Sequence, residues 1–194
     1  MSVIVEWKLN KIQELKHRSD KLTFIHTPKT AGTSLKKHPN FATYINNKGH
    51  IQASEQDHST FTIIRHPLQR FESFLNYRLG EKTPRRDFSP ALHIAYQNNM
   101  MSLDDIVQLI TLEDINKFEP FRFLTYWTHN VKVCLTIDEI DEFFTILDIP
   151  VTLPERTFNV SKKTRGNLSK TSIEKITSFY QDDIELYNHL IRTD

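Results

Sequence analysis

The chain has 194 residues, of which 38% are apolar and 25% are charged. These proportions are typical of a globular protein and exclude disordered, collagen-like and coiled-coil chains. Lysine and arginine number 25 against 24 aspartates and glutamates, and the formal net charge of +1 gives no general basic field for a nucleic acid. Cys134 is the single cysteine, so a disulfide-stapled secreted scaffold is also excluded.

The length is typical of one domain. We predict a single domain over residues 1–194, in which residues 1–21 form an N-terminal helical extension. That N-terminal stretch lacks a basic region followed by a continuous apolar run. No stretch of the chain approaches the roughly 20 apolar residues that a spanning helix needs. We therefore expect a cytoplasmic protein that has no membrane and no nucleic acid among its partners.

Short apolar runs predict buried β-strands. We expect strands at Leu22–His26, Phe61–Ile64 and Val131–Leu135, and a weaker one at Phe41–Ile45. Helical patterns separate these runs, and we expect one helix from Thr33 and another from Pro67 to Leu79. Capping pairs predict three further helix starts, at Ser102 with Asp105, Thr136 with Glu139, and Thr171 with Glu174. Strands that alternate with helices predict an α/β fold with a parallel sheet flanked by helices.

The segment FIHTPKTAGTSL, residues 24–35, is the strongest local signal. An apolar strand enters a turn of small residues with a lysine, and a helix follows. Such a turn directs backbone N–H groups at one anion. We expect the anion to contact Lys29, Thr30, Ala31, Gly32, Thr33 and Ser34. The turn is not a Walker loop, because the glycine that should precede the lysine is missing. An ordinary strand–helix turn is the alternative.

The segment FTIIRHPLQRFESFLNY, residues 61–77, repeats the plan of strand, basic residue and helix. Arg65 comes at the end of the expected strand, and Ser73 lies on the helix that follows. Arginine makes forked, charge-assisted contacts with phosphate, so we expect Arg65 and Ser73 to hold a second phosphate. A core helix with solvated polar residues is the alternative.

Together these two elements resemble the sulfotransferases that use 3′-phosphoadenosine 5′-phosphosulfate (PAPS). The first, TPKTAGTS, is similar to their IPKTAGTS-type 5′-phosphosulfate loop. The second is similar to their 3′-phosphate motif. The motif positions are filled by Arg65, Pro67, Arg70 and Ser73, and the family's C-terminal pattern by Asn159–Lys163, Asp183 and Tyr187. The resemblance covers most of the chain and implies a P-loop-like sulfotransferase fold. It also implies PAPS as cosubstrate, no metal, and a hydroxyl acceptor, expected to be a carbohydrate.

The attacking hydroxyl must lose a proton, which needs a base near neutral pKa. His50 follows Gly49, and uronyl 2-O-sulfotransferases have a similar Gly-His pair whose histidine is the base, so the resemblance to this branch implies that role for His50. Glu55, Asp57 and His58 are the alternatives. Lys29 is expected to offset charge on the bridging oxygen.

Other assignments remain open. For Lys162 and Arg165 we consider two roles: they close over the 3′ side of the nucleotide, or they belong to a solvated basic loop. His26 is expected to pack or hydrogen-bond at the strand end. The alternative functions are a P-loop-like kinase and an inactive nucleotide-binding scaffold. A kinase needs an aspartate after a strand to hold Mg²⁺, and Asp138 follows one but fits the first turn of a helix better. The acceptor, the regiochemistry and the oligomeric state stay open.

Overall fold

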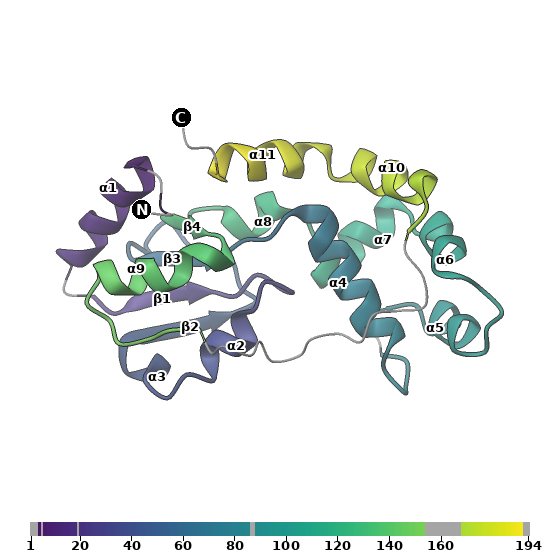
Figure 1. Cartoon of the computed structure of the whole chain (residues 1–194), viewed down its shortest axis with the longest axis horizontal. Coiled ribbons are helices and arrows are strands. Elements are labelled where there is room, and N and C mark those ends of the chain that lie inside the picture. Colours follow the sequence, from purple (N-terminus) through teal and green to yellow (C-terminus); the bar gives the residue numbers. More distant parts are fainter. Residues whose placement is uncertain (1–3, 5, 19, 86–87, 154–167, 192–194) are drawn as a thin grey trace. The chain divides into compact units, whose positions relative to one another are not determined.

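The structure is a computed structural model that describes residues 4, 6–18, 20–85, 88–153 and 168–191. Among the described residues, four parallel strands form one sheet in the order β2-β1-β3-β4 (Figure 1). The strands are β1 (Leu22–Ile25), β2 (Ile45–Gly49), β3 (Thr60–Ile63) and β4 (Val133–Leu135). The predicted α/β fold with a helix-flanked parallel sheet is confirmed.

The described residues fall into two compact units. Unit 1 contains the sheet, the C-terminal end of α11, and the elements α1 (Glu6–Lys16), α2 (Gly32–Lys36), α3 (Phe41–Tyr44), α8 (Leu124–Thr128), η2 (Ile137–Glu139) and α9 (Ile140–Ile146). Unit 2 contains α4 (Pro67–Leu79), α5 (Pro90–Gln97), α6 (Leu103–Leu109), α7 (Leu112–Lys117), η1 (Glu119–Phe121), α10 (Lys170–Phe179) and the start of α11 (Gln181–Ile191). The single domain over residues 1–194 stays a prediction.

Both faces of the sheet in unit 1 are covered, as a parallel sheet requires. Alternate strand residues such as Phe24, Phe61 and Leu135 form one core cluster with side chains of α1 and α9. On the other face, Cys134 packs with Leu124 and with the end of α11. The N-terminal helix therefore belongs to the core of unit 1. A buried ion pair joins it to η2, with 2.7 Å between Lys8 Nζ and Glu139 Oε1.

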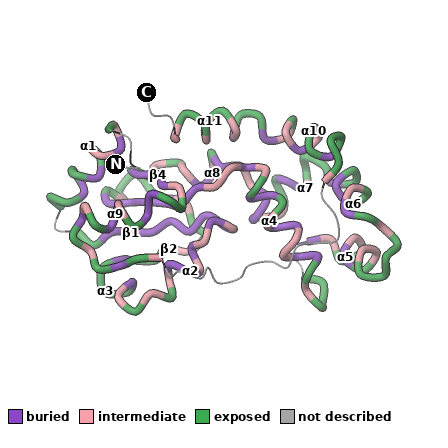
Figure 2. Tube along the Cα trace, viewed as in Figure 1, coloured by how far each residue is buried: buried purple, intermediate pink, exposed green. Residues whose placement is uncertain are grey.

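The expected strand at Phe41–Ile45 is wrong. Residues Phe41–Tyr44 form the short helix α3, and the strand begins only at Ile45. Strand β2 reads INNKG, with one buried residue at its start, and β1 is its one partner in the sheet. Figure 2 shows β2 far more exposed than β1. A polar edge strand has no apolar alternation, so the apolar pattern selected the wrong residues.

The capping pairs have mixed outcomes. Both Ser102 with Asp105 and Thr136 with Glu139 form complete capping boxes, as predicted. The pair of Thr171 with Glu174 is wrong, because Ser169 is the N-cap of α10 and accepts a hydrogen bond from the Ser172 amide. The chain leaves the helical path at Tyr180, whose buried hydroxyl donates to the Phe121 carbonyl.

Helix α4 begins at Pro67 and ends before Gly80, as predicted. It buries Phe71, Phe74 and Leu75 in the core of unit 2. Within the described ranges, no helix has both the length and the apolar character to cross a membrane.

Candidate functional site

The strand order creates a topological switch point beside β1. From β1 the chain moves to β2 on one side, and it returns to form β3 on the other side. In open parallel sheets, ligands bind outside the carboxyl ends of the strands where the connections diverge in this way. The TPKTAGTS loop follows β1, His50 follows β2 and Arg65 follows β3. Unit 1 thus brings these three predicted elements to one edge of its sheet.

The loop after β1 has an unusual backbone. Lys29 and Ala31 have φ values of 67° and 66°, in the left-handed region that residues with a Cβ rarely adopt. Such residues cost on the order of 1–3 kcal/mol each and cluster at ligand sites. Left-handed residues within a turn direct successive N–H groups into a concave anion site. Because α2 has only five residues, the loop amides and Lys29, rather than a helix dipole, are the groups suited to an anion.

Three buried threonines fasten this loop to the sheet. The Thr62 hydroxyl donates to the Ile25 carbonyl at 2.7 Å, so the Thr27 hydroxyl, 2.8 Å away, donates to the Thr62 oxygen. The Thr30 hydroxyl donates to the Thr27 carbonyl at 2.8 Å. The single hydroxyl proton of Thr30 is therefore used inside the loop. Thr30 can donate to an anion only through its backbone amide, while Thr33 lies half-buried and Ser34 buried in α2.

A histidine pair lies directly beside the loop. His26 Nδ1 and His50 Nε2 are 3.0 Å apart, and the ring of His26 stacks on Phe24 with 5.6 Å between centroids. His26 is 7% exposed. Burial, together with the positive charges of His50 and Lys36, lowers the pKa of His26 to about 3. His26 is therefore a neutral ring at physiological pH, and its predicted packing and hydrogen bonding are confirmed.

The His26 ring also explains why residue 32 is a glycine. A Cβ on Gly32 would lie 2.2 Å from Cδ2 and 2.5 Å from Nε2 of His26. Real Cβ atoms essentially never approach another heavy atom to less than 3.0 Å. The first residue of α2 must therefore lack a side chain for the loop and the His26 ring to lie against each other.

His50 is exposed at the end of β2. Gly49, with φ of 67°, turns the chain there without the steric cost of a side chain. The His50 ring lies edge-on to the buried Trp127, with 6.1 Å between centroids. The His50 ring is thus accessible from solvent on one side and contacts His26 on the protein side.

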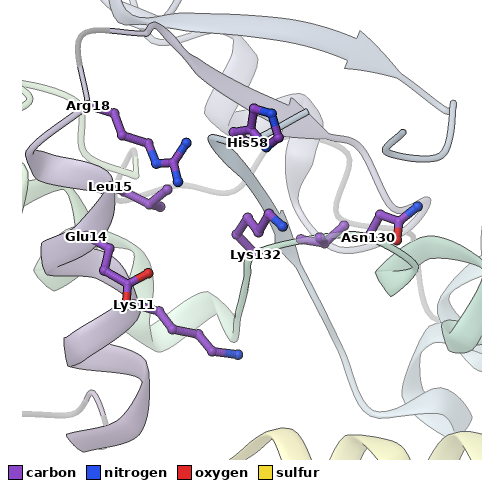
Figure 3. Close-up of a pocket in the computed structure, with 8 residues that line it drawn as sticks. Lys11, Glu14, Leu15, Arg18, His58, Asn130 and Lys132 are labelled. Atoms are coloured by element: carbon purple, nitrogen blue, oxygen red, sulfur yellow. The ribbon is translucent and has the colours of Figure 1, made fainter. Parts of the chain in front are cut away.

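Two of the alternative bases fit the role poorly. The Asp57 carboxylate accepts from the Lys48 ammonium and from the Ser54 amide and hydroxyl. These hydrogen bonds lower the pKa of Asp57 to about 2, so it is a weak base. His58 precedes β3 and lies at the opposite, amino-terminal edge of the sheet. It lines a pocket of about 360 Å³ there, with Arg18 and Lys132 (Figure 3). Glu55 occupies the exposed turn between Ser54 and Asp57.

Arg65 lies half-buried after β3, within electrostatic range of Tyr187. Burial and the nearby carboxylates of Glu139 and Asp138 raise the pKa of Tyr187, and Arg65 lowers it. Ser73 lies in α4 and belongs to unit 2. The pairing of Arg65 with Ser73 around one phosphate therefore stays a prediction.

Arg70 has a structural role that the motif did not indicate. It is 1% exposed, and its guanidinium donates to the carbonyls of Pro120, at 3.0 Å, and Arg122. Both acceptors belong to unit 2: Pro120 lies within the turn η1, and Arg122 follows it directly. Two of the donors that the resemblance would direct at a phosphate are thus used to fasten this turn to α4.

Some of the predicted residues fall outside the described part of the chain, namely Lys162, Arg165 and the segment Asn159–Lys163. Asp138 lies exposed in η2, the turn that caps α9. Among the residues described, no group of three or more histidines, cysteines or carboxylates is arranged to hold a metal ion.

The contact of His26 with His50 was missed by the sequence reasoning, although a signal exists. Strands β1 and β2 are parallel neighbours, with Ile25 opposite Gly49, and each histidine is the next residue along its strand. A correct assignment of β2 would have placed the two rings side by side. The expected strand at Phe41–Ile45 concealed this register.

Comparisons with protein-family models, with curated proteins and with solved structures gave no match for this chain. The motif residues and the geometry of unit 1 are therefore the features that indicate a function.

Proposed function

We propose that this protein is a PAPS-dependent sulfotransferase with a P-loop-like sulfotransferase fold, acting on a carbohydrate hydroxyl. One observation carries the proposal: the Lys29 loop and His50 follow neighbouring parallel strands and meet at the switch-point edge of one compact unit. A group that binds the donor anion and a group that can take a proton are thus adjacent. The motif resemblance supplies the choice of donor.

The residues divide the reaction between them. The amides of the loop around Ala31 and Gly32 bind the 5′-phosphosulfate, and Lys29 offsets negative charge that develops on the bridging oxygen. Arg65, with Ser73 as its predicted partner, recognises the 3′-phosphate. The bond between sulfur and the bridging oxygen breaks as the acceptor oxygen bonds to sulfur. Adenosine 3′,5′-bisphosphate leaves, and the proton of the acceptor hydroxyl passes to His50.

His50 suits the role of base because its ring is exposed and neighbours the loop. Histidine is the side chain that most often acts as a general base in enzymes. Asp57 is the weaker candidate, since its carboxylate is already satisfied by Lys48 and Ser54.

The first test is calorimetric binding of adenosine 3′,5′-bisphosphate and of ADP, each with and without Mg²⁺. We expect a clear preference for the 3′-phosphate that does not depend on metal. Preference for ADP with Mg²⁺ would overturn the proposal in favour of the kinase alternative. If the protein binds the bisphosphate but transfers no sulfuryl group to any carbohydrate hydroxyl, the result favours the alternative of an inactive nucleotide-binding scaffold.

The second test separates donor binding from catalysis. Lys29→Ala should lower turnover of PAPS by roughly 10²–10³, the typical loss of one preorganised group that stabilises developing charge, and should weaken bisphosphate binding far less. Lys37→Ala, an exposed lysine just after α2, is the matched control. Equal losses of binding and turnover in Lys29→Ala would refute its transition-state role. His50→Ala should abolish turnover while retaining nucleotide affinity.

A further inference from the structure

We propose that His26 is a positioning residue, which holds the ring of His50 through a neutral hydrogen-bond acceptor and leaves His50 Nδ1 to take the proton of the acceptor hydroxyl. The inference rests on the proposed role of His50 as base. It assigns a function to a side chain that the motif resemblance does not use.

The contact has the geometry of a fixed hydrogen bond. The two nitrogens are 3.0 Å apart, and the ring centroids are 4.5 Å apart with the planes inclined by 57°. His50 Nε2 faces His26, so a proton taken up by the neutral ring goes to the other ring nitrogen, Nδ1. The His26 ring is itself held between Phe24, on which it stacks, and the backbone of Gly32.

The required tautomers follow from the chemistry. Once His50 has taken a proton at Nδ1, both of its nitrogens carry hydrogen, and Nε2–H must donate to His26. His26 Nδ1 must then be an acceptor, so the proton of neutral His26 lies on Nε2. A second cation at His26 would repel the imidazolium of His50. Burial of His26 prevents this, because it strongly disfavours the charged ring.

The same ring connects the base to the donor loop. Gly32 is the first residue of α2 and contacts His26 so closely that no Cβ fits between them. Movement of the start of α2 toward the ring would therefore displace His26, and with it the hydrogen bond to His50. His26 thus sets the orientation of the base relative to the loop that is proposed to bind the donor.

The first experiment needs no substrate. Nitrogen NMR shifts of the histidine rings in the wild-type protein report which nitrogen of each neutral ring carries the proton. We expect His26 and His50 both to be protonated on Nε2. A His26 ring protonated on Nδ1 would make it the donor to His50 and would overturn the proposal, whether or not the protein transfers sulfate.

The second experiment uses two variants with opposite chemistry. His26→Phe keeps a ring against Gly32 and Phe24 but removes the acceptor, whereas His26→Asn keeps an acceptor near the position of Nδ1. His17→Phe, an exposed histidine after α1, is the control. We expect His26→Phe to redistribute the His50 tautomers and to lower kcat about 10- to 100-fold, a part of the ~10²–10⁴ that a positioned base contributes.

His26→Asn should restore the Nε2–H tautomer of His50 and most of the turnover. His26→Phe, which keeps a ring against Gly32, should retain the affinity for adenosine 3′,5′-bisphosphate. Unchanged His50 tautomers in a folded His26→Phe protein would refute the positioning role. Failure of the sulfotransferase proposal has another signature: no variant and no wild-type protein transfers sulfate, while the tautomers of His50 still respond to His26.

Discussion

Replacing Gly32 by alanine tests the close contact between the loop that follows β1 and the His26 ring. The new Cβ would lie 2.2 Å from His26 Cδ2 and 3.0 Å from Phe24 Cζ. The ring has little freedom to retreat, because it stacks on Phe24 and is hydrogen-bonded to His50. Either the ring or the start of α2 must move.

The expected cost follows from two opposing effects. An extra methyl group in a well-packed site destabilises by about 1–3 kcal/mol. Alanine recovers roughly 0.5–1 kcal/mol over glycine in a helix interior, and less at the first position of α2. We therefore expect Gly32→Ala to lower the free energy of unfolding by about 1–2 kcal/mol. In a chain of this size that lowers Tm by roughly 2–8 °C.

A double-mutant cycle is the assay. Thermal unfolding is measured for the wild type, Gly32→Ala, His26→Ala and the double variant. Without the imidazole ring there is room for the methyl group, so Gly32→Ala should be neutral or slightly stabilising in the His26→Ala background. The coupling between the two positions isolates the contact from the cost of each single change. The same loss in both backgrounds would refute the steric argument.

Three further predictions concern stability. Lys8→Ala should cost about 3–5 kcal/mol in denaturant unfolding, because it leaves the buried Glu139 carboxylate without a countercharge; replacing both by apolar residues should recover part of it, less the capping bond that Glu139 accepts from the Thr136 amide, and an equal loss would contradict this reasoning. The pKa of His26 is about 6.5 in the unfolded chain and about 3 in the folded protein. The contribution of the neutral His26 ring to the free energy of unfolding is therefore complete above the unfolded pKa. That contribution is lost as the pH falls toward 3, by up to roughly 1.4 kcal/mol per pH unit; His26→Phe should therefore lose less stability than the wild type between about pH 7 and about pH 5, and identical pH curves would refute the argument. Arg70→Lys should cost roughly 1.5–3 kcal/mol, since an ammonium cannot donate to both carbonyls that the guanidinium reaches; measured on folded protein, bisphosphate affinity should not change, and a loss there would restore Arg70 as a phosphate ligand.

Much of the fold could be predicted because its central strands are apolar. Strands β1, β3 and β4 are almost fully buried, and each appears in the sequence as a short apolar run. The helix that begins at Pro67 and the capping box at Ser102 have local chemical signals that tertiary structure does not override. These elements are enough to predict the class of fold, and to predict that the loop after β1 lies at the carboxyl ends of the strands.

The remaining features depend on contacts between distant residues. Strand β2 is polar, and only its pairing with β1 defines it. The contact between His26 and His50 depends on the register of that pairing. The role of Arg70 depends on two carbonyls about 50 residues further along the chain. No local pattern at Arg70 distinguishes an arginine that binds phosphate from one that fastens a turn.

The geometry of the sheet narrows the choice of base even before His50 is mutated. Strands β1 and β3 have four residues each, so the two edges of the sheet are roughly 13 Å apart at ~3.3 Å per residue. His58 lies at the amino-terminal edge, whereas Lys29 lies at the carboxyl-terminal edge, and a proton transfer requires direct or water-bridged contact. The Asp57 carboxylate is a weak base, because its pKa is lowered to about 2. If His50→Ala retained full activity, Glu55 would therefore be the alternative to test next.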